Sequence, residues 1–216
     1  MPPSNIRKNR RQRGRRGRTY LLGTLALVII VAVGWYVYAQ SANTNVATTV
    51  YARLNTSQGA IDVELYQDKT PKTVSNFVNL ARSGFYNNLV WHRIIKGFVI
   101  QTGDPNTRNG LGDRSTWGQG GSSQTVPLET DSSLHNSVGY LGMARGQDRD
   151  SGTSQFYINV GDNSSTLDGQ YTVFGKVTSG LDMAFAIANV PVDSPQNGQP
   201  LDPLPFLTSV TISSSP

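Results

Sequence analysis

A short apolar stretch, residues 91–104, contains three side chains whose types and spacing could do chemistry. Arg93, Phe98 and Gln101 stand on a frame in which apolar and polar positions alternate, as on a strand with one buried face. Burying a guanidinium among such neighbours is costly unless the group has a partner or a task. The arginine is therefore either a structural residue paired with an acid such as Asp104, or the centre of a functional site.

Composition and spacing exclude several other kinds of site. The chain of 216 residues has no cysteine, which rules out thiol catalysis, disulfide frameworks and zinc-thiolate sites. His92 and His135 are isolated and form no ligand pair, and Asp148 with Asp150 lacks the glutamate that would complete a calcium loop. We therefore predict a site without a metal or a cofactor.

The net charge of +5 belongs to one end of the chain. Eight of the 19 Lys and Arg residues fall within residues 1–18, which contain no acid, so the rest of the chain has a net charge of −3. We interpret residues 1–18 as a basic, disordered cytoplasmic tail and predict no nucleic-acid partner. A tail that binds anionic lipid or nucleic acid is the alternative, but a topology signal explains the same charges more simply.

An uncharged segment, residues 20–39, follows this tail. As a helix it would reach about 30 Å, the thickness of a bilayer core, and aromatic residues lie at both of its ends. We predict that residues 19–39 form a single-pass transmembrane anchor in the cell membrane, with the N-terminus cytoplasmic and the following domain extracytoplasmic. A signal peptide cleaved after Ala39 is the alternative, and would make the domain a secreted one. Residues 40–49 are a polar linker in either case.

Residues 50–216 carry the pattern of a mainly β domain. Thr70-Pro71 predicts the start of a helix with Thr70 as its N-cap, and a second short helix is expected over residues 180–189. Strands are expected over residues 51–56, 60–66, 138–144, 155–160, 171–177 and 207–212, in addition to the two within residues 91–104. Short strands without a βαβ rhythm predict a closed eight-stranded antiparallel β-barrel capped by two α-helices.

Four blocks of this domain resemble the cyclophilin family of peptidyl-prolyl isomerases. The most specific block is the order aromatic-His-Arg-Ile-Ile-x-Gly-Phe-x-x-Gln-x-Gly-Asp in residues 91–104. The other three follow in the family's order, at residues 135–145, 151–158 and 167–177. The resemblance extends over about residues 50–213 and looks bacterial-like. It implies a barrel fold, prolyl isomerase activity and proline-containing polypeptides as partners.

Carried over position by position, the resemblance implies that Arg93 is the catalytic residue. The residues implied to bind substrate are Phe98, Val99, Tyr157 and Leu167 in a proline pocket, Gln101, Gln155 and the backbone near Arg145 and Gly146 along the substrate main chain, and Tyr171 at the pocket rim. The best-known members have Met, Phe and His where this chain has Val99, Tyr157 and Tyr171. Thr166 replaces the tryptophan of the cyclosporin-sensitive members, which predicts weak cyclosporin binding.

These residue types suit rotation about an imide bond. Amide resonance raises a barrier of roughly 18–20 kcal/mol, and no bond has to break, so neither a nucleophile nor a metal is needed. A twisted imide nitrogen regains its lone pair, and a fixed N–H donor binds that state better than the planar one. Arginine keeps its charge and presents a rigid fork. We expect Gln101, on the neighbouring strand, to orient Arg93.

Two functions of different classes remain open on the sequence. In the first, the chain is a monomeric prolyl isomerase tethered outside the membrane, where it speeds the folding of exported proteins. In the second, the same pocket is a tethered module that binds proline-containing segments and catalyses only incidentally. The presence of Arg93 and Gln101 favours the enzyme. A protein that only binds proline-containing segments does not need an N–H donor that stabilises the twisted imide.

Overall fold

The computed structural model describes residue 33 and residues 49–215. The predicted tail, all of the predicted anchor over residues 19–39 except residue 33, and nearly all of the predicted linker lie outside the described residues. Among the residues that are described, no helix combines the length and the apolar character needed to span a membrane. Residues 49–215 belong to a single structural unit.

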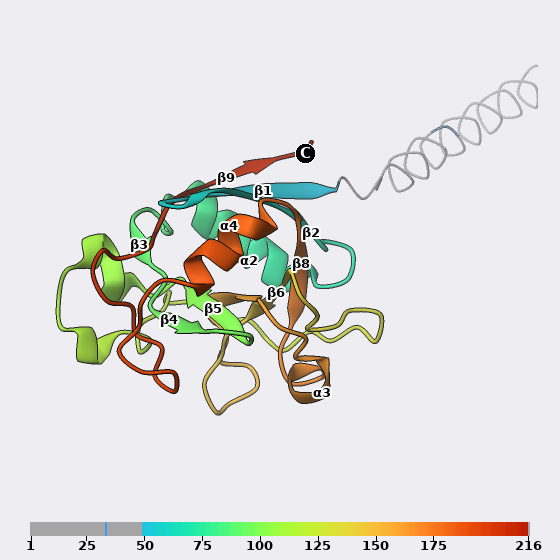
Figure 1. The fold of residues 1–216 in the computed structure, drawn as a ribbon. Coiled ribbons are helices and arrows are strands. Elements are labelled where there is room, and N and C mark those ends of the chain that lie inside the picture. Colours follow the sequence, from blue (N-terminus) through green and yellow to red (C-terminus); the bar gives the residue numbers. More distant parts are fainter. Residues whose placement is uncertain (1–32, 34–48, 216) are drawn as a thin grey trace, which may run out of the picture. The chain divides into compact units, whose positions relative to one another are not determined.

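Nine antiparallel strands form one curled sheet, in the order β3-β9-β1-β2-β8-β6-β7-β5-β4 (Figure 1). Their bounds are β1 Val50–Thr56, β2 Gly59–Leu65, β3 Leu89–Val90, β4 Arg93–Ile95, β5 Val99–Thr102, β6 Tyr140–Met143, β7 Phe156–Asn159, β8 Val173–Ser179 and β9 Phe206–Ser213. Each predicted strand is present, with ends that lie within two residues of the predicted ones. β3 was not predicted.

The prediction of a closed eight-stranded barrel is wrong in two respects. The sheet has nine strands, and its ladder stays open between the edge strands β3 and β4. These two strands are consecutive in the chain and are separated by Trp91-His92 alone, but no ladder joins them. The loop before β9 supplies the missing partners, because Trp91 N donates to Pro205 O and Ile94 N donates to Gly198 O.

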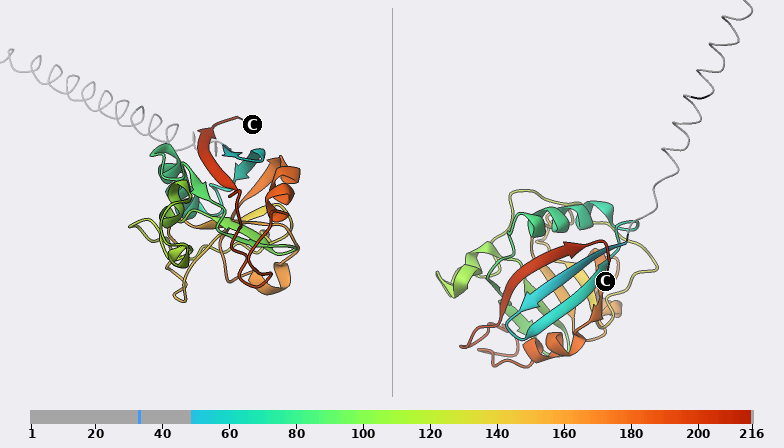
Figure 2. Two further views of the ribbon diagram at one scale, coloured as in Figure 1. Left: turned by 60° about the vertical axis from the view of Figure 1, so that its left-hand side comes forward. Right: turned by 90° about the horizontal axis from the view of Figure 1, so that it is seen from above.

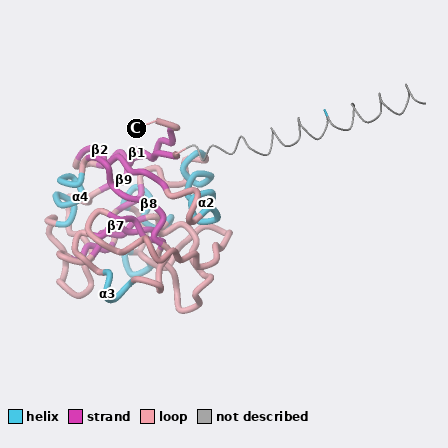
Figure 3. Tube along the Cα trace, turned by 90° about the vertical axis from the view of Figure 1, so that its right-hand side faces the viewer, coloured by secondary structure: helices cyan, strands magenta, loops and turns pink. Residues whose placement is uncertain are grey.

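Two longer helices cover the sheet, as predicted. They are α2, Pro71–Arg82, and α4, Leu181–Ala188, and they lie on opposite sides of the strands (Figures 2 and 3). The one-turn helix α3, Ser164–Leu167, and the 3-10 helices η1, Pro105–Gly110, and η2, Arg114–Thr116, were not predicted. The segment that follows residue 104 is therefore partly helical.

The N-terminus of α2 is capped differently from the prediction. Thr70 precedes the helix, but its hydroxyl donates to Tyr66 O and makes no cap bond. Glu129, from a distant loop, accepts instead from the backbone N–H groups of Lys72 and Thr73, at 3.1 and 2.8 Å. A carboxylate at this position also suits the positive end of the helix dipole, so a long-range contact replaces the expected local one.

An aromatic cluster fills the space between α2 and the sheet. Phe156 on β7 packs edge-on against Phe77 and Tyr86, with ring centroids 5.3 and 5.5 Å apart. Because side chains alternate along a strand, the next residue, Tyr157, belongs to a separate small cluster with Val99 and Leu167. β7 therefore joins the core to the candidate site.

Candidate active site

Strand register brings three of the predicted site residues into one row. Arg93 on β4 pairs with Gln101 on β5, and Gln101 in turn pairs with Tyr157 on β7. Directly opposed residues on neighbouring strands face the same side of a sheet. The row therefore places a cation, an amide and an aromatic ring side by side on the surface of three adjacent strands.

A cavity of about 320 Å³ opens over this row. It is lined by Arg93, Phe98, Val99, Gln101, Ala144, Arg145, Tyr157, Leu167 and Tyr171. Its apolar base consists of the buried side chains of Val99, Tyr157 and Leu167, against which Phe98, Ala144 and Tyr171 pack. Except for Ala144, every one of these residues was predicted for the site.

A second cavity, of about 380 Å³, adjoins the first. It holds the two remaining predicted residues, Gly146 and Gln155, and is otherwise lined by the glycine-rich loop of residues 118–122 and by residues 151 and 153. Gln101, Ala144 and Arg145 line both cavities. A ligand in the first cavity can therefore continue into the second past these three residues.

Arg93 is a partly buried cation. Among the described residues its guanidinium makes no hydrogen bond and belongs to none of the four ion pairs; its nearest aromatic contact is the Phe98 ring, 5.8 Å from the centroid. Burial lowers the pKa of Arg93 from its usual value. The alternative partner, Asp104, accepts instead from the backbone N–H groups of Asn106 and Gly118. The donors of Arg93 therefore face the cavity without a partner from residues 49–215.

Gln101 has a different partner from the predicted one. Its side-chain nitrogen donates to the side-chain oxygen of Gln155 at 2.8 Å, and no hydrogen bond joins it to Arg93. Gln155 in turn donates to the carbonyls of Gly118 and Gly120, at 2.9 and 2.6 Å. These side-chain amide hydrogen bonds attach Gln101 and Gln155, which lie at the boundary between the two cavities, to the glycine-rich loop.

Comparison with known proteins identifies the family of this chain. The family model described as "Cyclophilin type peptidyl-prolyl cis-trans isomerase/CLD" matches residues 51–211. The chain belongs to the cyclophilin-type peptidyl-prolyl isomerase family. Its enzyme class is accordingly that of the peptidyl-prolyl cis-trans isomerases, the name carried by relatives at about 40% identity.

Relatives of this cyclophilin include bacterial and eukaryotic proteins. Peptidyl-prolyl cis-trans isomerase A of Dickeya dadantii is 39% identical over 163 residues, which cover 73% of this chain and 82% of the relative. Peptidyl-prolyl cis-trans isomerase-like 2 of Rhizopus delemar is 44% identical over 144 residues, but these make up only 26% of that protein. A Cryptosporidium parvum cyclophilin, solved in the presence of the dipeptide Ala-Pro, is 30% identical with a TM-score of 0.67, and the match covers 76% of this chain and 99% of that one.

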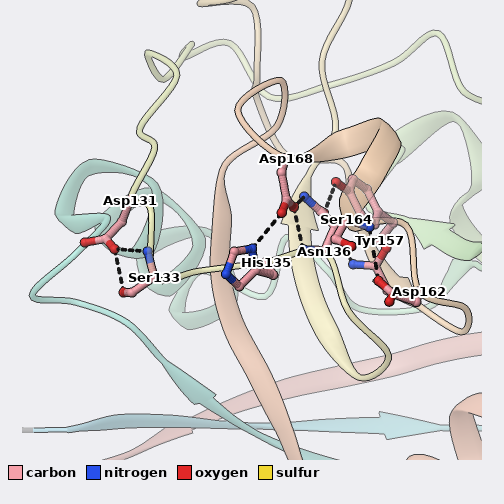
Figure 4. Close-up of polar contacts among 9 residues, drawn as sticks. Asp131, Ser133, His135, Asn136, Tyr157, Asp162, Ser164 and Asp168 are labelled. Carbon is pink, nitrogen blue, oxygen red and sulfur yellow. Dashed lines mark hydrogen bonds and ion pairs between the residues drawn. The ribbon is translucent and has the colours of Figure 1, made fainter.

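Behind the pocket of this cyclophilin lies a polar network that sequence reasoning missed (Figure 4). The Tyr157 hydroxyl donates to the side-chain oxygen of Asn136 at 2.8 Å. The backbone and side-chain N–H groups of Asn136 donate to one oxygen of Asp168, at 2.7 and 3.0 Å, and His135 contacts the other at 2.7 Å. Burial disfavours the charged form of Asp168, but these hydrogen bonds outweigh it and hold the pKa of the carboxyl below its usual value. Since Leu167 precedes Asp168, the network anchors two pocket residues.

Replacing Tyr157 with Phe tests whether the hydroxyl serves structure or substrate. We expect the free energy of unfolding to fall by about 1 kcal/mol, because a buried hydrogen bond to Asn136 is lost. The ring remains in the pocket, so kcat/KM for a proline peptide is expected to change little. Urea unfolding and a peptide isomerisation assay measure the two effects. Tyr86→Phe, which removes a buried hydroxyl outside the pocket, is the matched control. A large loss of activity at unchanged stability would show that the hydroxyl acts on the substrate.

His92, next to Arg93 in the chain, is a buried imidazole with no function assigned to it. It is 5% exposed, and neither ring nitrogen has a hydrogen-bond partner among the described residues. Burial is the main cause that lowers the pKa of His92 to about 4, although nearby Asp104 opposes the shift. The side chain is therefore neutral at physiological pH.

Proposed function

We propose that this cyclophilin isomerises Xaa-Pro bonds by directing Arg93 at the imide nitrogen of a proline held in the 320 Å³ cavity. The observation that supports this proposal most strongly is a partly buried guanidinium with no partner among residues 49–215, on the wall of an apolar pocket. A guanidinium kept for structure would have a carboxylate or carbonyl acceptor. The N–H donors of Arg93 are therefore available to a ligand.

The pocket supplies the other requirements of the reaction. Val99, Tyr157 and Leu167 are buried apolar surfaces against which a proline ring can pack. The surrounding low dielectric strengthens a hydrogen bond from Arg93 to the nitrogen lone pair that appears only when the imide twists. Because the planar imide offers no such lone pair, the interaction lowers the barrier and does not merely hold the substrate.

Exchange NMR separates catalysis from binding. A peptide with one Ala-Pro bond, mixed with a catalytic amount of the full chain, is expected to show cis–trans exchange within seconds, against tens to hundreds of seconds unaided. Shifts in peptide resonances without faster exchange would instead identify a proline-binding module. Neither binding nor exchange, in a chain shown to be folded by circular dichroism, would overturn both functions.

The proposed setting is the outer face of a membrane, where the domain would assist the folding of exported proteins. The uncharged run of residues 20–39 and the eight basic residues that precede it support this setting. Protease added to intact cells is expected to digest the domain and leave the N-terminal tail protected. A mature chain beginning at Gln40 would identify a cleaved signal peptide, and protection of the whole chain would contradict export.

Weak cyclosporin binding remains part of the proposal. Thr166 is exposed on α3, beside the pocket residue Leu167, and offers the drug far less apolar surface than a tryptophan would. Thr166→Trp is expected to lower the concentration of cyclosporin that inhibits peptide isomerisation. An unchanged inhibition curve would show that another position determines affinity.

A further inference from the structure

Arg145 separates the two cavities and lines both. It follows β6 and is partly exposed. Its guanidinium is fixed by Gln170 O at 2.9 Å, by Gly146 O at 2.9 Å and by the ring of Tyr171, whose centroid is 4.9 Å away. All of these contacts are uncharged. Arg145 is therefore held in place without being neutralised.

The acids nearest in the sequence are engaged elsewhere. The Asp148 carboxylate accepts from its own loop at Asp150 N, and Asp150 accepts from Leu128 N. Asp168 is occupied by Asn136 and His135. Neither cavity is lined by an acidic residue, whereas Arg93 adds a second positive charge to the first. Two cations without a lining anion give this surface a positive potential.

The remaining donors of Arg145 are suited to a carboxylate. Its Nε and Nη1 atoms donate to backbone carbonyls, and Nη2 has no acceptor among residues 49–215. A guanidinium binds carboxylates with geometric specificity, and hydrogen bonds between charged groups are stronger than neutral ones. A substrate that crosses from one cavity to the other must pass this group.

We infer that Arg145 is a specificity-determining residue that selects prolines flanked by an acidic side chain. The inference rests on the proposed isomerase function and names its substrate class: Xaa-Pro segments with Asp or Glu directly before or directly after the proline. Lysine in the same place meets Arg145 and Arg93 with a like charge and is disfavoured. Exported chains rich in acidic residues near proline are the substrates that this surface favours.

Two sets of three matched peptides test the preference. They carry Glu, Gln or Lys beside one proline and are otherwise identical, and one set places the variable residue before the proline and a second set after it. In at least one set, kcat/KM with the full chain is expected to be about three- to tenfold higher for Glu than for Lys, with Gln between them, as for a partly exposed ion pair. Raising the salt concentration is expected to reduce the ratio.

Two variants assign the preference to Arg145. Arg145→Gln is expected to bring the Glu-to-Lys ratio close to one. Arg149→Gln removes the same charge from the same loop, but Arg149 contacts Gly169 O and lines neither cavity, so the ratio is expected to stay. Because each variant is judged by a ratio, a change in its absolute activity does not affect the conclusion.

The outcomes separate this inference from the function on which it rests. Equal rates for Glu and Lys in both sets, with all peptides accelerated, would overturn the inference and leave the isomerase intact. No acceleration of any peptide would overturn the isomerase function itself. A preference for Glu that persists in Arg145→Gln would show that another group recognises the charge of the residue beside the proline.

Discussion

Replacing Arg93 with Ala is expected to lower kcat/KM for an Xaa-Pro peptide by roughly 10²-fold or more, or about 3 kcal/mol of transition-state stabilisation. The side chain has no structural partner among residues 49–215, so its removal breaks no protein hydrogen bond or ion pair there. The folded state is accordingly expected to persist. The loss should fall on kcat more than on KM, because the donor acts on the twisted imide and not on the planar one.

Two further variants make this expectation specific. Arg93→Lys keeps the charge but loses the planar fork, so partial activity is expected. Arg53→Ala removes an exposed arginine paired with Asp62 at 2.7 Å on the β1–β2 hairpin, and should leave the rate unchanged. If Arg93→Ala raised KM and left kcat intact, the residue would be a substrate-binding group and the proposed mechanism would fail.

Acidification is expected to destabilise the domain through His92. In the folded state the pKa of this imidazole is about 4, whereas the unfolded chain takes up the proton near 6.5. Between these values the unfolded state binds more protons, so the free energy of unfolding falls as the pH drops. The full pKa shift corresponds to a loss of about 3 kcal/mol in the free energy of unfolding. This loss is complete near pH 4 and absent above pH 7.

The measurement is the slope of unfolding free energy against pH in urea, for the wild type and for His92→Leu. The variant cannot take up this proton, so the slope between pH 4 and 6.5 is expected to be smaller. Asp168 loses stabilisation in the same direction, but only as the pH falls through its own, lower pKa. If His92→Leu fails to fold, NMR titration of the His92 ring in the wild type decides the matter. A ring that titrates near 6.5 would contradict the prediction.

The central row of the site could be predicted because local rules determine it. Alternation along residues 99–101 sets which side chains share a face, and the order of residues 91–104 sets the spacing of Arg93 from Gln101. The pocket residues Val99, Tyr157 and Leu167 came from the family resemblance and lie together as it implied. Periodicity alone would have assigned all three to the core.

The parts that were missed depend on contacts between distant loops. Glu129 caps α2 from 57 residues away in sequence, and Asn136 joins Tyr157 to Asp168 from a segment without periodicity. The sequence likewise did not indicate that residue 142 must be glycine, although any side chain there would collide with the Tyr157 ring. Contacts between distant loops produce no recognisable pattern among residues that are close together in the sequence. Gln101 shows the same limit, because its place on the strand next to Arg93 was predicted and its hydrogen-bond partner was not.

The position of β9 has a consequence for how the domain is made. This strand is the last of the described strands, yet it lies inside the sheet, where it pairs with β1 on one side and β3 on the other. A nascent chain that has not yet released residues 206–213 therefore exposes two unpaired strand edges at once. Pairing β1 with β9 joins residues more than 150 positions apart, which is slow by its topology. This domain can complete its own folding only after its synthesis has reached the final strand.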